Sequence, residues 1–167
     1  MVTVDELFTP ENAFGEPVTL DHGEQTIVRV CAALRTGMNR SAGTPDRKLS
    51  LRDGYDLDLD GMGGEMAYAK KRNVYVDLGV IPRRGGHDLV VNGLTVDVKT
   101  NANHNGDLLV KPSKANDPSD VYVLMTGSFP EYVYRGFALK EQVFKEYNLQ
   151  DLGHGFTYVL PQSSLKR

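Results

Sequence analysis

The feature that most constrains the fold is the pair of alternating runs on either side of Asn92-Gly93, within residues 86–100. An Asn-Gly pair between such runs is the strongest short-range signal for a two-residue hairpin turn, because both central residues must adopt positive φ. A loop of this length also fixes the register, and it places Asp88 opposite Asp97. We therefore predict a β-hairpin whose strand pairing follows from its turn.

Alternation along the strands divides this hairpin into two faces. The apolar face is expected to lie against the core, and it carries Leu89, Val91, Leu94, Val96 and Val98. The other face carries Asp88, Val90, Thr95, Asp97 and Lys99. Directly opposed residues have Cβ atoms roughly 4.5–5.5 Å apart, where like charges destabilise a sheet. A divalent cation between Asp88 and Asp97 would remove that repulsion, because Mg²⁺ binds carboxylate oxygens together with water and phosphate.

Lys99 is expected to project from the same face as Asp97, about 7 Å further along the strand. It is placed to meet a phosphate oxygen or a metal-bound water. The alternative is a hairpin whose polar face is simply solvated, with Lys99 in a surface ion pair that contributes ~0–1 kcal/mol.

A third acidic candidate, Glu65, lies on a helix predicted over residues 61–72. The apolar stripe of this helix consists of Leu59, Met62, Met66 and Ala69. Glu65 lies at the edge of that stripe rather than on the outer face, and a carboxylate in such a place is destabilising unless it is paired or ligated. The sequence therefore indicates a functional or ion-paired glutamate.

The stretch from Asp56 to Gly61 begins like a calcium-binding EF-hand loop, D-x-D-x-D-G. Position 12 of that loop should be a bidentate Glu but is Ala67 here. A calcium-binding module is therefore the less favoured alternative, and we expect Asp60 to cap the helix that follows.

The remaining pattern predicts one α/β domain, with an N-terminal arm and helix over residues 1–55 and a core over residues 56–167. Asp21 is expected to cap a helix that runs to about Arg35 and buries Ile27, Val30, Cys31 and Leu34. Strands are expected at 73–80, 107–111, 121–126, 131–138 and 156–160, with a helix at 139–147. Together these elements predict a central mixed β-sheet flanked by helices.

Charge and targeting signals narrow the setting in which the chain acts. The net charge of −3 does not indicate a nucleic-acid-binding protein, so local groups of basic residues matter more than the net charge. Four such groups are candidates for contact with a phosphate backbone: Arg83, Arg84, Lys111 and Lys114. The chain starts without a basic segment and apolar run, and no stretch approaches about 18 apolar residues, so we expect a cytoplasmic protein with no membrane partner. The sequence leaves a homodimer open.

The acidic candidates and the lysine follow one another in the order E…D…D-x-K: Glu65, Asp88, Asp97 and Lys99. This order resembles the PD-(D/E)xK nuclease superfamily, the restriction-endonuclease-like enzymes, over residues 61–138. Asp88 matches the first Asp of the motif, Asp97 its second acidic residue, Lys99 its lysine and Glu65 the upstream helix glutamate. His87 stands where the motif's proline would be.

The resemblance implies a restriction-endonuclease-like core and metal-assisted hydrolysis of DNA, leaving 5′-phosphate and 3′-hydroxyl ends. Asp88, Asp97 and the backbone carbonyl of Val98 would hold Mg²⁺ or Mn²⁺, and Glu65 would bind the ion through water or hold a second one. Lys99 would orient or help deprotonate the attacking water and offset charge on the phosphate. The competing interpretation is a nucleic-acid-binding or assembly protein that kept the fold without catalysis.

Overall fold

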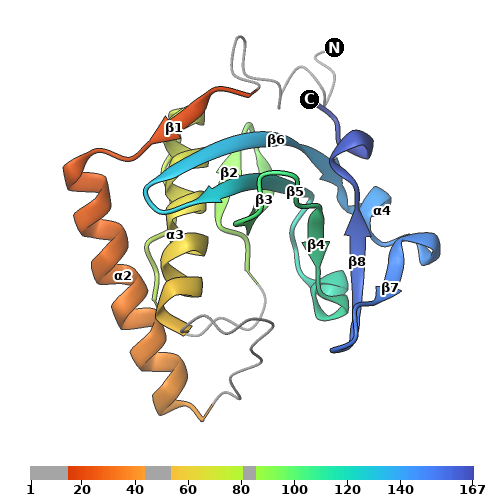
Figure 1. Ribbon diagram of the computed structural model, residues 1–167, viewed down its shortest axis with the longest axis horizontal. Helices are drawn as coiled ribbons and strands as arrows, with labels where there is room; N and C mark the ends of the chain where they lie inside the picture. The colour runs from red at the N-terminus through yellow and green to blue at the C-terminus, as the bar shows by residue number, and fades with distance from the viewer. Residues whose placement is uncertain (1–14, 44–53, 81–85) are drawn as a thin grey trace.

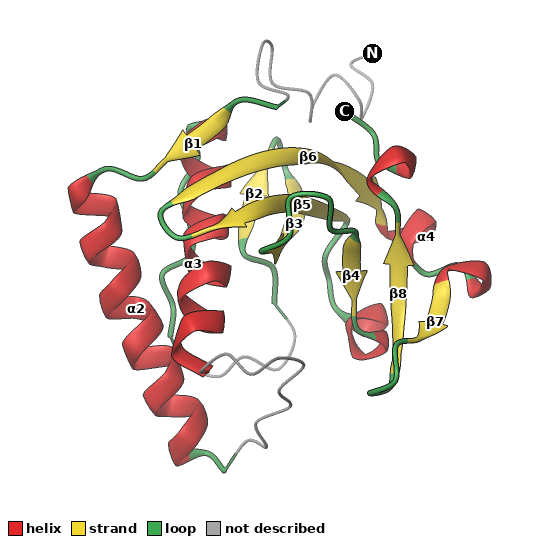
Figure 2. Ribbon diagram, viewed as in Figure 1, coloured by secondary structure: helices red, strands yellow, loops and turns green. Residues whose placement is uncertain are grey.

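The computed structural model describes residues 15–43, 54–80 and 86–167, and within these ranges the protein is mixed α/β (Figures 1 and 2). The helices are α2 (His22–Ser41), α3 (Gly54–Arg72) and α4 (Lys140–Val143), with 3₁₀ helices η1 (Pro112–Asn116), η2 (Glu146–Asn148) and η3 (Gln162–Ser164). The strands are β1 (Pro17–Thr19), β2 (Leu89–Val91), β3 (Leu94–Asn101), β4 (Leu108–Val110), β5 (Val121–Ser128), β6 (Glu131–Leu139), β7 (Leu149–Asp151) and β8 (Phe156–Leu160). No helix in these ranges is long and apolar enough to cross a bilayer.

The main sheet has five strands in the order β1-β6-β5-β3-β2. Strands β3 and β5 are parallel and the other neighbours are antiparallel, so the predicted mixed sheet is confirmed. A smaller antiparallel sheet has the order β4-β8-β7. Figure 1 shows the main sheet strongly curved, with β4, β7 and β8 on the right and α2, α3 and β1 on the left.

The two faces of the main sheet are covered differently. Helices α2 and α3 bury one face in the larger core, whereas the small sheet and α4 cover a second core on the other face. The predicted helix over residues 139–147 is wrong beyond its first turn, because Phe144 leaves the helical conformation at φ −86°, ψ 52°. In the part of the chain that the structure describes, long helices therefore flank one face of the sheet.

The predicted hairpin is confirmed around its turn. Asn92 and Gly93 have φ of 50° and 83°, as a two-residue turn of this kind requires. The register pairs Leu89 with Val96 and Val91 with Leu94. Its apolar face lies in the larger core as expected.

Helix α2 begins as predicted but buries another face. Asp21 forms a capping box with Glu24, and the helix continues beyond Arg35 to Ser41. The buried core residues on it are Val28, Cys31 and Ala32, whereas Ile27, Val30 and Leu34 are exposed. Both faces carry apolar side chains, so periodicity could not choose between them; the face with the smaller residues packs against α3.

Helix α3 begins at Gly54, seven residues earlier than predicted. Asp60 is therefore inside the helix rather than its cap, and its Oδ1 accepts a hydrogen bond from the N–H of Phe129 at 2.9 Å. The stretch from Asp56 to Gly61 is helical, so the calcium-loop interpretation is wrong. The predicted strand at 73–80 is also wrong, because residues 74–80 form no strand; the N–H of Asp77 donates to the carbonyl of Asp88 at 3.1 Å.

Candidate functional site

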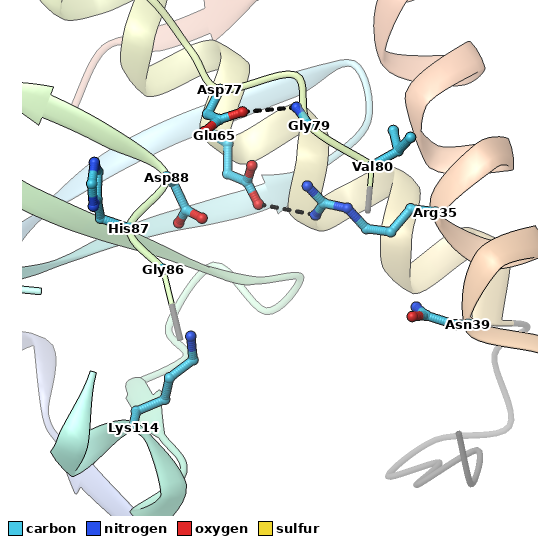
Figure 3. A pocket seen from close by; sticks show the side chains of 10 residues that line it. All are labelled: Arg35, Asn39, Glu65, Asp77, Gly79, Val80, Gly86, His87, Asp88 and Lys114. Atoms are coloured by element: carbon cyan, nitrogen blue, oxygen red, sulfur yellow. Dashed lines mark hydrogen bonds and ion pairs between the residues drawn. The ribbon is translucent and has the colours of Figure 1, made fainter. Parts of the chain in front are cut away.

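A polar cavity of about 190 Å³ opens where β2 begins, between the sheet edge and the two long helices. Figure 3 shows the side chains that line it: Arg35, Asn39, Glu65, Asp77, Gly79, Val80, Gly86, His87, Asp88 and Lys114. The carboxylates of Glu65 and Asp88 point into the same space, with Arg35 on one side and Lys114 on another (Figure 3). The cavity thus holds two acidic side chains between two basic ones.

Asp88 lies at the edge of the sheet rather than in its ladder. Its N–H donates to the carbonyl of Val96 at 2.8 Å, although Val96 already pairs with Leu89, so the ladder is displaced as in a β-bulge. The Asp88 carboxylate accepts the backbone N–H of Val98 at 2.7 Å. The predicted direct opposition of Asp88 and Asp97 is therefore wrong, because the side chain of Asp88 takes the hydrogen bond that a strand backbone would have made.

Asp97 is buried on the other face of the sheet, with 1% of its surface exposed. It pairs in register with Tyr122, a member of the second core. Lys99 Nζ donates to its Oδ1, and Lys114 Nζ lies 3.3 Å from its Oδ2. Two ammonium groups thus lie beside this one buried carboxylate.

Glu65 approaches the same edge from the helical face and is only 6% exposed. Its Oε1 lies 3.3 Å from Arg35 Nη1. Its Oε2 is buried and has no hydrogen-bond partner among the described residues. Burial and, after it, the charge of Asp88 raise the pKa of Glu65 to about 8, against the opposing effect of Arg35.

Asp88 links Glu65 to Asp97 electrostatically. Burial, followed by the charge of Asp97, raises the pKa of Asp88 to about 6, while Lys99 and the N–H of Val98 oppose the shift. The three carboxyl groups therefore form a row that crosses the sheet edge, from the helical face through Asp88 to the opposite face. A row of this kind favours any cation that can enter beside it.

The backbone of Val98 faces this row as well. In an extended strand the N–H and C=O of one residue point to the same edge. Because the Val98 N–H reaches Asp88, the Val98 carbonyl also faces the start of β2. The structure thus brings together Glu65, Asp88, Asp97, Val98 and Lys99, all predicted from the sequence.

The four predicted phosphate-contacting residues have different outcomes. Lys114 lines the cavity and contacts Asp97, and its second partner, Asp117, lies 2.7 Å away. Lys111 borders a different cavity. Arg83 and Arg84 lie outside the described residues.

Sequence reasoning missed Arg35. This residue follows Cys31 by four positions and Ala32 by three, so it lies on the buried face of α2. An arginine on a buried face needs an acidic partner, and that was the available signal. The wrong choice of face for α2 concealed it.

The fold and site define a mixed α/β protein with a charged cavity at a sheet edge. The chain belongs to a family of unknown function, DUF5843, which matches residues 17–132, more than half of its length. That span contains Arg35, Glu65, Asp88, Lys99 and Lys114. No curated protein and no solved structure matches the chain significantly.

Proposed function

We propose that this protein is a metal-dependent nuclease that hydrolyses DNA phosphodiester bonds on a restriction-endonuclease-like core. The observation that carries the proposal is that Glu65 and Asp88 line one cavity with Lys114, which contacts Asp97, while Lys99 binds the same Asp97. The order of α3, the β2–β3 hairpin and the parallel strand β5 supports the same interpretation.

The side chains present fit a divalent cation, although not as a ready-made cage. Within residues 15–43, 54–80 and 86–167, no three His, Cys, Asp or Glu side chains gather as metal ligands. Asp97 is held by lysines, which leaves Asp88, the unpartnered Oε2 of Glu65 and the Val98 carbonyl as oxygen donors. Mg²⁺ needs only one or two carboxylates when water and substrate phosphate complete its shell. Bound there, Mg²⁺ or Mn²⁺ would supply a water of lowered pKa and offset phosphate charge.

The basic residues then have separate tasks. Lys99, beside Asp97, would orient the attacking water and offset negative charge that develops on the phosphate. Arg35 and Lys114 line the same cavity as the two carboxylates. These two basic side chains would hold the substrate phosphates on either side of the carboxylates. In-line attack by water on the phosphorus, with breakage of the P–O3′ bond and protonation of the leaving 3′ oxygen, would leave a 5′-phosphate and a 3′-hydroxyl.

One observation favours the second candidate, a nucleic-acid-binding protein without catalysis. Asp97 is paired with Lys99 and Lys114, and Glu65 is paired with Arg35. These ion pairs account for the buried charge without any metal. Under this interpretation the protein binds DNA equally well with and without Mg²⁺ and never cuts it.

The test is a cleavage panel over linear, circular, single-stranded and branched DNA, with Mg²⁺, Mn²⁺ or a chelator. We expect metal-dependent cleavage by the wild type and a loss of at least about 100-fold in Lys99→Ala. Lys145→Ala, which removes an exposed lysine elsewhere, serves as the matched control. Binding without cleavage by the wild type, on every substrate and with both metals, would leave the second candidate in place.

A further inference from the structure

A second cavity, of about 340 Å³, lies between η1 and the start of β8. Its lining comes from two short segments: Lys111, Pro112 and Ser113 on one side, and His154, Gly155, Phe156 and Thr157 on the other. Figure 1 shows the lower end of β8 beside the coil below β4 that contains η1. The volume is within the range of sites that bind small molecules and single bases.

Phe156 contributes an exposed aromatic ring to the lining of this cavity. It is the first residue of β8, and 61% of its surface is exposed although it belongs to a strand. Among the described residues of the lining, Lys111 and His154 are the ones with ionisable side chains. Asp151 pairs with Phe156 in the β7–β8 ladder, and its Oδ1 accepts the N–H of Gly153 at 2.9 Å. An open aromatic ring beside a lysine is the combination that stacks and neutralises unpaired nucleotides.

Helix η1 connects this cavity to the acidic site. Lys111 is the N-cap residue of η1 and borders the second cavity, whereas Lys114 lines the first and contacts Asp97. Three residues of 3₁₀ helix rise only about 6 Å. A strand whose phosphate lies at Lys114 can therefore reach Phe156 within a short distance along its backbone.

We propose that the second cavity binds an unpaired base of a single-stranded nucleic acid, with Phe156 stacking on the base and Lys111 contacting its phosphate. The proposal rests on the nuclease function proposed above and names its substrate: a single-stranded segment flanking the phosphodiester that is cut. Duplex DNA does not fit this role, because its bases are already stacked and paired.

The test measures binding without cleavage, by fluorescence anisotropy of a labelled single-stranded oligonucleotide in the presence of a chelator. Phe156→Ala should weaken binding by about 5- to 150-fold, since stacking on one aromatic ring contributes about 1–3 kcal/mol. Phe156→Tyr should keep most of the affinity because the ring remains. Binding to a duplex of the same sequence should change less than about 3-fold.

Tyr147→Ala is the matched control, because Tyr147 is 81% exposed and does not line this cavity. We expect it to bind like the wild type. Asp151→Asn should tighten binding, since it removes the acidic charge beside the stacked base. Circular dichroism and thermal melting should show both alanine variants folded, because each replaces an exposed side chain.

Unchanged single-strand affinity in Phe156→Ala, or an equal loss on single-stranded and duplex probes, would overturn the base-binding proposal. Unchanged affinity would instead suit a protein partner on this exposed ring. The nuclease proposal is judged separately, by cleavage with Mg²⁺ and the Lys99→Ala variant. A protein that never cuts but loses single-strand affinity in Phe156→Ala would therefore retain the base site and lose the nuclease assignment.

Discussion

The carboxylate of Asp88 accepts the backbone N–H of Val98 at 2.7 Å, so an acidic side chain completes the hydrogen bonding of β3 just before β2 begins. The same carboxylate raises the pKa of Glu65 and has its own pKa raised by Asp97. One group thus has a structural role through its hydrogen bond and a chemical role through its charge. The two roles can be separated by substitution.

Asp88→Asn should keep the fold and lose the chemistry. The amide oxygen of Asn can accept the Val98 N–H, so the free energy of unfolding should change by less than about 1 kcal/mol. Cleavage should fall by at least about 100-fold, because the charge that attracts a cation is gone. Asp88→Ala should lose the same activity and also about 1–3 kcal/mol of stability, since the Val98 N–H is left unpaired. Urea denaturation with a cleavage assay measures both; equal stability losses in the two variants would contradict this separation.

Stability should fall as the pH rises from about 5 to about 8 in metal-free buffer. The pKa of Glu65 is about 8 in the folded protein and ordinarily 4.5, so the folded state holds more protons than the unfolded state between these values. The free energy of unfolding therefore decreases with pH across this window, by an amount on the order of a few kcal/mol. Asp88 contributes in the same direction between 3.8 and about 6.

Urea denaturation of wild type and Glu65→Gln at several pH values measures this dependence. Glu65→Gln should flatten the slope, because its side chain does not ionise. Mg²⁺ added at about pH 8 should restore wild-type stability, by about 2.7 kcal/mol at a hundred times its Kd, if it binds the folded state alone. An equally steep slope in Glu65→Gln would contradict the assignment to Glu65.

Arg35→Ala should destabilise the protein most at alkaline pH. The Arg35 side chain is 27% exposed and lies 3.3 Å from Glu65, whose carboxylate loses its counter-charge in the variant. We expect a loss of about 1–3 kcal/mol at about pH 8 and a smaller one at about pH 6, where Glu65 is protonated. Lys145→Ala is the exposed control in the same denaturation experiment. A loss that does not vary with pH would show that Arg35 acts through packing instead.

Gly64→Ala should destabilise α3 where it crosses β3. A Cβ at Gly64 would lie 2.0 Å from Thr100 Oγ1 and 3.2 Å from Thr100 Cβ, so the helix or the strand must shift. The expected loss is about 1–3 kcal/mol, and Thr100→Ala in the same chain should recover much of it. Gly61→Ala, with nothing within 4 Å of the added Cβ, should instead stabilise the helix by about 0.5–1 kcal/mol. Thermal melting of all three variants tests this; equal effects at Gly61 and Gly64 would contradict the close approach.

The amino-acid sequence alone determined the local features of the fold. Asn92-Gly93 set the turn and the register of Leu89 with Val96, and Asp21 set the start of α2. These features depend on dihedral angles and hydrogen bonds within a few residues of chain. Glu65 was also expected to be buried and in need of a partner, because its helical stripe placed it next to the core.

Only the tertiary structure decided how the site is assembled. Asp88 leaves the ladder for the N–H of Val98, Arg35 reaches Glu65 from a helix 30 residues away, and Lys114 reaches Asp97 from η1. Each of these pairings depends on which face of α2 packs and on how the small sheet covers the second core. Those choices come from long-range packing between faces of similar apolarity, and periodicity within one segment carries no information about its partner.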